Sequence, residues 1–437
     1  MVTSIKKYQT RPLDSFKKAV ELRKEYYQNV REAKQQGKLL ITGGADSMVA
    51  LPAGLGDYVF FEGEPYGATI SMDPEFSGKC VEAAEAKNFA RDMCAYMRNY
   101  WGSMFLNKYY FGGEFPKPDF VMQLGFCDTH AKWMQQVGEY MNAPYFGIDM
   151  PVGTPGRNVE AKVKYLTSQM NDAIEWMQKV TGRKYDDDKL REAVRNECKS
   201  STLWSEIVCY NKAIPAPLEQ RLIFTLFIIC ILRRYERKSV EFYETLRDEV
   251  KQRVADGIAA VATERCRLMD DSQPPWYFLQ LYKYMEKYGV SVVGSHYSFF
   301  LGGSLEEMPD GSLGAPKTPD EMGMPMKTRE DILRAYALWY IKKPIISQMF
   351  ALPHFKSETM LRLVKEWKVN GVIFHLNRGC EGTAMGQMEN RLALTKAGIP
   401  VMTYEGNMAD RREFDEAQTL RRIDAFMESL GLSKLES

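Results

Sequence analysis

The sequence predicts an α/β fold with two parallel-sheet domains, a helical N-terminal arm and a helical middle segment. Two observations predict it. Short apolar runs alternate with helix-like stretches on both sides of a purely helical middle, as in parallel sheets with crossover helices. The chain has 437 residues, of which 45% are hydrophobic and 26% charged, typical of a globular protein of about three domains. The expected segments are a helical arm (1–37), a first α/β domain (38–155), a helical segment (156–259) and a second α/β domain (260–437).

The charge balance and the apolar runs exclude several classes of protein. The 58 basic and 57 acidic residues give a net charge of +1, which argues against a nucleic-acid partner. The longest apolar run, residues 222–232, is too short to span a bilayer and predicts a buried helix rather than membrane attachment. Residues 1–7 show no secretory pattern, so we expect a cytoplasmic protein whose eight cysteines are reduced thiols.

The first α/β domain is expected to contain four strands and a long helix. Apolar runs without helical periodicity predict buried strands, and the first of them leads into Gly43 and Gly44. A helix is expected between the second and third strands, over residues 79–100. The four predicted strands are 39–42, 58–61, 120–124 and 145–148.

The middle of the chain predicts helices, and the strand–helix alternation returns after residue 260. The expected helices of the middle segment are 159–180, 187–210 and 217–259. A long loop is expected over residues 301–328, which are rich in glycine, proline and methionine. The expected strands of the second α/β domain are 266–269, 290–293, 344–347, 372–376 and 400–404, and the expected helices are 277–288, 383–397 and 415–430.

Two cysteines follow directly after predicted parallel strands. Cys127 comes after strand 120–124 and Cys380 after strand 372–376, at the strand ends where open α/β sheets bind ligands. Cys94, on the predicted helix 79–100, is the third candidate for the same crevice. Thiolates suit iron–sulfur clusters, and three of them would leave one iron of a four-iron cluster open. The alternative is that these cysteines, like the other five, are small buried apolar residues.

Acid–base candidates also lie at predicted strand ends. Glu64 follows strand 58–61, His130 follows Cys127 by three residues, and His296 follows strand 290–293. The alternative for the histidines is a hydrogen-bonded core residue, and for Glu64 a solvated loop carboxylate. The sequence contains no GxxxxGK[ST], GxGxxG following a strand, GxSxG, HExxH or CxxC pattern, which argues against P-loop, dinucleotide, esterase and zinc chemistry.

Several of these segments together resemble the 2-hydroxyacyl-CoA dehydratase and benzoyl-CoA reductase family. The similarity covers most of residues 38–437 and is loosest in the helical middle. The segments that carry it are Glu64-Pro65-Tyr66-Gly67-Ala68, residues 92–98 around Cys94, residues 126–133 around Cys127, residues 371–380 ending in Arg378-Gly379-Cys380, and residues 398–407 and 419–428. Where the family has Glu-x-Asp after the last strand, this chain has Glu405-Gly406-Asn407.

The resemblance implies a cofactor, a set of partners and a substrate class. It implies two flavodoxin- or Rossmann-like sheets and one [4Fe–4S] cluster, held by the residues that match the family's ligands, Cys94, Cys127 and Cys380. It further implies a homologous cluster-carrying subunit, an ATP-hydrolysing iron–sulfur activator supplied by ferredoxin, and an acyl-CoA thioester as substrate.

Within the family, the segments around Cys127 and Cys380 are most similar to the larger cluster-carrying subunit of ATP-dependent benzoyl-CoA reductase. The expected function is therefore transfer of single low-potential electrons to the ring of an aryl-CoA, giving a cyclohexadiene-carboxyl-CoA. His296 and Glu64 are the candidates for proton handling. Two alternatives stay open at this point, a subunit of a 2-hydroxyacyl-CoA dehydratase and a non-catalytic scaffold subunit.

Overall fold

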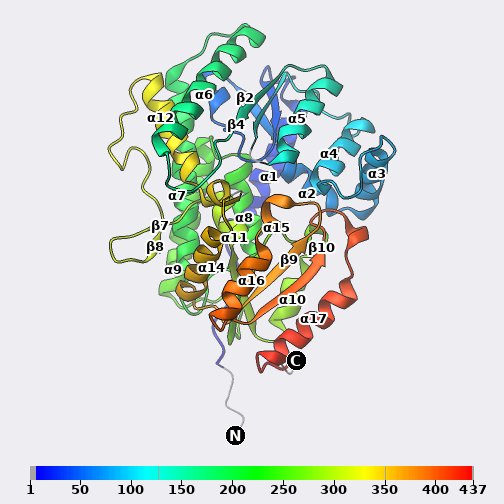
Figure 1. Ribbon diagram of the computed structural model, residues 1–437, viewed down its shortest axis with the longest axis vertical. Helices are drawn as coiled ribbons and strands as arrows, with labels where there is room; N and C mark the ends of the chain where they lie inside the picture. Colours follow the sequence, from blue (N-terminus) through cyan, green and yellow to red (C-terminus); the bar gives the residue numbers. More distant parts are fainter. Residues whose placement is uncertain (1–5, 126, 350, 436–437) are drawn as a thin grey trace.

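The computed structural model describes residues 6–125, 127–349 and 351–435, and it contains two four-stranded parallel sheets, one in each half of the chain (Figure 1). The predicted α/β fold with two parallel sheets is confirmed. The first five residues of the expected N-terminal arm lie outside the described residues, as does Phe126 in the motif around Cys127. The boundaries given above for the four segments stay predictions.

The first sheet has the strand order β2-β1-β3-β4. All residues of β1 are buried, as expected for a parallel strand that is covered on both faces. Ile41 pairs with Phe60 of β2 on one side and with Phe120 of β3 on the other. The strands are β1 (Leu39–Gly43), β2 (Tyr58–Glu62), β3 (Phe120–Gly125) and β4 (Tyr145–Asp149).

The second sheet has the strand order β10-β9-β5-β6. Its strands are β5 (Cys266–Asp271), β6 (Val290–Ser295), β9 (Gly371–Asn377) and β10 (Val401–Gly406). Counted along each half, both sheets have the order 2-1-3-4. Each sheet therefore has its switch point between its first and third strands, where ligands bind in folds of this type.

The helices of the first half differ from the prediction at one place that matters for the site. The expected helix over 79–100 is wrong: α3 (Pro74–Glu85) ends before Asn88, which has a positive φ of 65°, and α4 (Ala95–Phe105) begins a new helix. Cys94 thus lies at the N-cap of α4, in a loop, and not inside a helix. The other helices of this half are α1 (Ser15–Glu32), α2 (Gly63–Ser71) and α5 (Asp128–Met141).

The middle of the chain forms a helical layer beside both sheets (Figure 1). The apolar run 222–232 belongs to a buried helix as predicted, and this helix, α8, contacts both β2 and β6. Arg233 to Glu236 interrupt the expected helix over 217–259, so that two helices form there. The layer contains α6 (Val159–Thr181), α7 (Asp187–Tyr210), α8 (Gln220–Leu232) and α9 (Arg237–Ala255), with the short 3₁₀ helix η1 (Leu51–Leu55) packed against α7.

Two further predictions in the second half are wrong. Residues 344–347 form part of a helix and not a strand, because Pro344 suits the first turn of a helix and the apolar run is too short to show a period. The expected helix over 383–397 is divided by Gly386, whose φ is 75°. The remaining elements are η2 (Trp276–Phe278), α10 (Gln280–Glu286), α11 (His296–Gly302), β7 (Glu306–Glu307), β8 (Leu313–Gly314), α12 (Arg329–Lys342), α13 (Pro344–Met349), α14 (His354–Glu366), α15 (Glu381–Ala384), α16 (Gln387–Lys396), η3 (Arg411–Glu413) and α17 (Glu416–Ser429).

A buried ion pair joins the two halves close to the Cys94 loop. Arg98 of α4 donates to Asp410, which follows β10, with 2.9 Å between Nη1 and Oδ2, and both side chains are almost completely buried. Beside it, the Asn99 amide donates to the Ala409 carbonyl oxygen at 2.9 Å. Burial by itself would raise the pKa of Asp410, but Arg412 and Arg98 outweigh it and lower that pKa to about 2.

Among the described helices, none combines the length and the apolar character that crossing a membrane would require.

We predict that Asp410→Asn lowers the free energy of unfolding by about 3–5 kcal/mol at pH 7, because it removes the buried partner of Arg98 and leaves only Glu85, which is partly exposed, at 3.3 Å. The pKa of Asp410 is depressed, so its stabilisation is present above pH 4 and is lost as the pH falls toward 2. Urea unfolding of the wild type and of Asp410→Asn between pH 7 and pH 2 measures this. The difference between their free energies of unfolding should become smaller toward pH 2. The exposed Asp57→Asn is the control, and equal effects of the two substitutions would contradict the role of the ion pair.

Candidate functional site

Three cysteines that are far apart in sequence line one cavity. Cys94 precedes α4, Cys127 precedes α5 and Cys380 precedes α15, so that each lies in a loop at the start of a helix. The cavity is also lined by residues from the loops that follow β1 and β5 and by side chains from α2, α5 and α11. Its lining comprises Ala45, Glu64, Cys94, Tyr96, Cys127, Asp128, Thr129, His130, Trp133, Gln273, Tyr297, Leu301, Ile345, Gly379, Cys380, Gly382, Thr383 and Met408. We call this space the cysteine cavity.

The Cys380 loop packs directly on the Cys94 loop because its residue at the contact, Gly379, has no side chain. Gly379 has a φ of 75°, which favours glycine. A Cβ atom at this position would lie 3.1 Å from the carbonyl oxygens of both Asp92 and Met93. The chain therefore needs a residue without a side chain immediately before Cys380.

The three thiols influence one another. Burial raises the pKa of Cys94 to about 12, and the nearby Cys380 adds to the shift. Burial also raises the pKa of Cys127 far above its usual value, again with contributions from Cys380 and Cys94, while the His130 amide opposes it by donating to Cys127 Sγ at 3.4 Å. Without a positive centre beside them, the thiols of Cys94 and Cys127 stay protonated at neutral pH.

The donor set of the cysteine cavity fits an iron–sulfur cluster better than a single ion. Within the described part of the chain, no group of three His, Cys, Asp or Glu side chains is arranged to hold one metal ion. The cavity offers about 90 Å³ to the centres of water molecules, and one such centre needs only roughly 10–15 Å³. The space is large enough for several atoms, and soft sulfur ligands from three separate loops surround it.

Glu64 and His130 form a hydrogen-bonded pair in the wall of the cysteine cavity. Glu64 accepts from His130 Nε2 through one oxygen and from the Ala45 amide at 2.6 Å through the other. The Gly44 amide donates to Gln123 Oε1 at 2.8 Å, which turns Gln123 Nε2 toward His130 Nδ1 at 3.1 Å. The proton of His130 is therefore on Nε2 and points at the Glu64 carboxylate.

His296 lies elsewhere. It lines a neighbouring cavity with Lys356 and Gln348, and its Nε2 atom is 3.2 Å from Gln348 Oε1. Burial lowers the pKa of His296 to about 4, and Lys356 adds to this shift. The two cavities share Ile345, Gly382 and Thr383, but His296 does not line the cysteine cavity, so the structure does not bring it together with Glu64.

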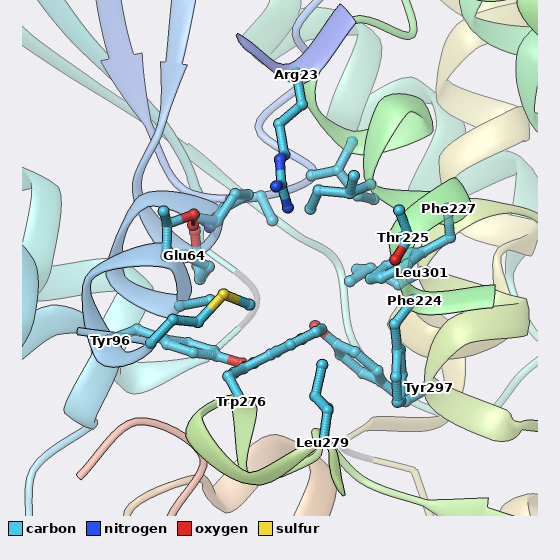
Figure 2. Close-up of a pocket in the computed structure, with 17 residues that line it drawn as sticks. Arg23, Glu64, Tyr96, Phe224, Thr225, Phe227, Trp276, Leu279, Tyr297 and Leu301 are labelled. Atoms are coloured by element: carbon cyan, nitrogen blue, oxygen red, sulfur yellow. Dashed lines mark hydrogen bonds between the residues drawn. The ribbon is translucent and has the colours of Figure 1, made fainter. Parts of the chain in front are cut away.

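An aromatic pocket adjoins the cysteine cavity (Figure 2). Arg23 of α1 and Glu64 of α2 reach into it, and its walls come mainly from α2 and α8, with further side chains from η2 and α11. Five residues line both spaces: Ala45, Glu64, Tyr96, Tyr297 and Leu301. Tyr96, Trp276, Tyr297, Phe224 and Phe227 supply aromatic rings to the pocket. A flat apolar group seated there would lie next to the cysteine cavity.

The remaining five cysteines line neither space. All eight cysteines are free. The residues that sequence reasoning missed at the site are Tyr96, Tyr297, Trp276 and Gln273. Gln273 follows β5, so its position after a predicted strand could have identified it as a candidate site residue. Tyr96 lies in the segment 92–98 that carries the family resemblance, whereas Trp276 and Tyr297 come from short helices that carry no motif.

Comparison with known proteins identifies the family. Residues 67–430 match the family 2-hydroxyglutaryl-CoA dehydratase, D-component, and the chain therefore belongs to it. The resemblance stated from the sequence is confirmed. The relatives found are dehydratase or reductase subunits that act on acyl-CoA compounds.

Three relatives show the range of this similarity. The (R)-phenyllactyl-CoA dehydratase alpha subunit of Clostridium sporogenes is 24% identical over 92% of each chain. The alpha subunit of (R)-2-hydroxyglutaryl-CoA dehydratase of Acidaminococcus fermentans is 27% identical over 72% of this chain and 61% of its own length. The B subunit of the benzoyl-CoA reductase of Thauera aromatica is 23% identical over 80% of each chain.

We predict that Gly379→Ala destabilises the protein more than Gly398→Ala does. Both glycines have similar positive φ values, 75° and 77°, but only at Gly379 would the new Cβ meet other atoms. The backbone strain of roughly 1–2 kcal/mol is common to both variants. The additional loss of unfolding free energy in Gly379→Ala therefore measures the contact of the Cys380 loop with the Cys94 loop. Urea unfolding measures it, and equal losses in the two variants would show that the loops are not in close contact.

Proposed function

We propose that this chain is the cluster-carrying catalytic subunit of a 2-hydroxyacyl-CoA dehydratase, in which Cys94, Cys127 and Cys380 hold one [4Fe–4S] cluster. The observation that carries the proposal is the convergence of the three thiols on one cavity beside an aromatic pocket. Three ligands leave one iron without a protein sulfur. The bound cluster would supply single electrons at low potential, the chemistry that cofactors of this kind contribute.

Glu64 is the residue placed to move a proton in this site. Its carboxylate lies in the wall shared by the cysteine cavity and the aromatic pocket. Because Gln123 holds His130 with its proton on Nε2, His130 donates a hydrogen bond to the Glu64 carboxylate. Glu64 then accepts a proton from the thioester substrate, and His130 fixes its orientation. A role of His296 in proton handling stays a prediction that this geometry does not support.

The aromatic pocket would receive the acyl group and exclude water from it. Phe224, Phe227 and Trp276 present apolar surface toward the interior of the pocket. Since water is displaced from these walls, charges that develop on the acyl group interact more strongly with Glu64 than they would in solvent.

A benzoyl-CoA reductase is the second candidate function. The aromatic lining of the pocket favours it, because ring faces and edges pack well on a planar aryl group. The similarity to the B subunit of a benzoyl-CoA reductase also supports it. In this case two electrons and two protons would go to the ring and give a cyclohexadiene-carboxyl-CoA, and Glu64, once protonated, would deliver one of these protons.

Either function requires further subunits. The relatives are themselves named as alpha or B subunits, which supports a complex with at least one other subunit. We propose that a homologous cluster-carrying subunit pairs with this chain and that an ATP-hydrolysing iron–sulfur activator, supplied by ferredoxin, delivers the electrons.

The ligand assignment predicts the iron content of single variants. Cys94→Ser, Cys127→Ser and Cys380→Ser should each lose the iron and the broad visible absorption of the complex purified without oxygen, since serine is a poor ligand for a cluster. Cys209→Ser is the matched control, because Cys209 lies outside both spaces. Iron that remains at wild-type content in all three variants would contradict the assignment.

Assays with the reduced complex separate the two candidate reactions. A dehydratase converts a 2-hydroxyacyl-CoA to its enoyl-CoA and needs only catalytic amounts of electrons and ATP. A reductase consumes two electrons, with coupled ATP hydrolysis, for each aryl-CoA converted. The complex acting on neither substrate, although its iron is complete, would favour the scaffold alternative.

A further inference from the structure

An arginine without an ion-pair partner faces the aromatic pocket. Arg23 is half-buried on α1, and its guanidinium group points into the pocket (Figure 2). The structure gives it no hydrogen bond or ion pair with any residue in the described ranges 6–125, 127–349 and 351–435. Its charge is therefore available to a molecule in the pocket.

The other polar groups of the pocket already have partners. The Thr69 hydroxyl donates to the Pro65 carbonyl at 2.8 Å, and the Thr225 hydroxyl donates to the Arg221 carbonyl at 3.0 Å. Glu64 is held by the Ala45 amide and by His130. Arg23 is thus the group in this lining that is suited to bind a negative charge.

We propose that Arg23 binds an oxyanion of the thioester substrate, either a carboxylate at the end of the acyl group or a phosphate of CoA. The proposal rests on the proposed function. A guanidinium group makes two parallel hydrogen bonds with a carboxylate or a phosphate, and such bonds strengthen when apolar walls exclude water. Because the aromatic pocket shares five residues with the cysteine cavity, one ligand can contact Arg23 and still reach Glu64.

Binding measurements on the oxygen-free complex test this with three thioesters: glutaryl-CoA, butyryl-CoA and butyryl-pantetheine. Arg23→Gln should weaken binding of the anionic ligand by roughly 10- to 100-fold. If Arg23→Gln loses affinity for glutaryl-CoA alone, the group that Arg23 binds is the carboxylate of the acyl chain. If the variant loses affinity for both CoA esters but not for butyryl-pantetheine, the group that Arg23 binds is a phosphate of CoA. Arg23→Lys should retain part of the affinity, because it keeps the charge.

The neighbouring Lys24→Gln is the matched control, since Lys24 is exposed and does not line the pocket. Equal affinities in the Arg23→Gln and Lys24→Gln complexes would overturn the role of Arg23, and so would an equal loss for all three thioesters. A wild-type complex that binds none of the three overturns the proposed function and the role of Arg23 together.

A second inference concerns Cys380, whose sulfur lies close to two polar side chains. Gln273 Nε2 lies 3.3 Å from Cys380 Sγ, and Thr383 Oγ1 lies 3.2 Å from the same sulfur. Both side chains are buried.

The orientation of the Gln273 amide is fixed by a chain of hydrogen bonds that begins at the backbone. The Met408 amide donates to Asn377 Oδ1 at 3.1 Å, so Asn377 Nδ2 points the other way and donates to Gln273 Oε1 at 2.9 Å. The Thr383 hydroxyl donates to the same Gln273 oxygen at 2.7 Å. The nitrogen of the Gln273 amide is therefore the atom that faces Cys380.

We infer that Gln273 is a positioning residue that raises the reduction potential of the cluster by donating to the Cys380 sulfur. This inference also rests on the proposed function. Reduction adds negative charge to the cluster and its sulfurs, and an N–H donor stabilises that charge. Asn377 acts through Gln273 by holding its amide in the donating orientation.

A redox titration of the cluster, followed by electron paramagnetic resonance, tests this. Gln273→Leu should shift the potential to a more negative value with the iron content unchanged. Gln273→Glu keeps the oxygen that Asn377 and Thr383 contact but has no N–H, so it should shift the potential in the same direction.

Gln387→Leu is the matched control, because Gln387 is equally buried but donates to the His375 carbonyl oxygen at 3.0 Å. A potential that is the same in Gln273→Leu, Gln273→Glu and wild type would overturn the inference about Gln273. A wild-type complex that contains no iron would overturn the proposed function as well, so the two failures are distinguishable.

Discussion

The buried ion pair between Arg98 and Asp410 is the interaction on which the rest of the site depends. It lies where the start of α4 meets the segment after β10, and Arg98 also donates through Nε to the Met93 carbonyl oxygen at 3.1 Å. The same arginine therefore fixes the Cys94 loop and ties it to the second half of the chain. Burying two charges is expensive unless they are paired, so the protein keeps the halves together in this one arrangement.

The helical layer supports the site from the other side. Asp46 follows directly after Ala45, whose amide donates to Glu64, and it has a positive φ of 63°. Lys343 Nζ lies 2.7 Å from Asp46 Oδ1, and Arg234 contacts the same carboxylate. These two cations come from the end of α12 and from the segment between α8 and α9. The loop that orients Glu64 is thus held by the helical layer as well as by its own sheet.

The two halves share a strand order but contribute different chemistry. Cys127 and Cys380 follow the third strand of their respective sheets, and Glu64 and His296 both follow the second. The first half supplies two of the thiols and the paired carboxylate, whereas His296 is packed into a separate cavity. The geometry therefore concentrates acid–base groups on one side of the three thiols, and leaves the second half to hold Cys380 through Gln273 and Thr383.

The amino-acid pattern alone predicts the fold class, the approximate positions of the strands in both four-stranded sheets, and the placement of Cys127, Cys380 and Glu64 at strand ends. It could do so because buried parallel strands are continuous apolar runs and ligands collect at their carboxyl ends. It misplaced Cys94 inside a helix, since the left-handed turn at Asn88 has no strong sequence signal. The three-dimensional packing is needed to see that Glu64 pairs with His130 and not with His296, and that Arg23 and Gln273 line the site. These contacts join residues dozens to hundreds of positions apart, and they depend on how the two sheets and the helical layer pack, which local periodicity does not encode.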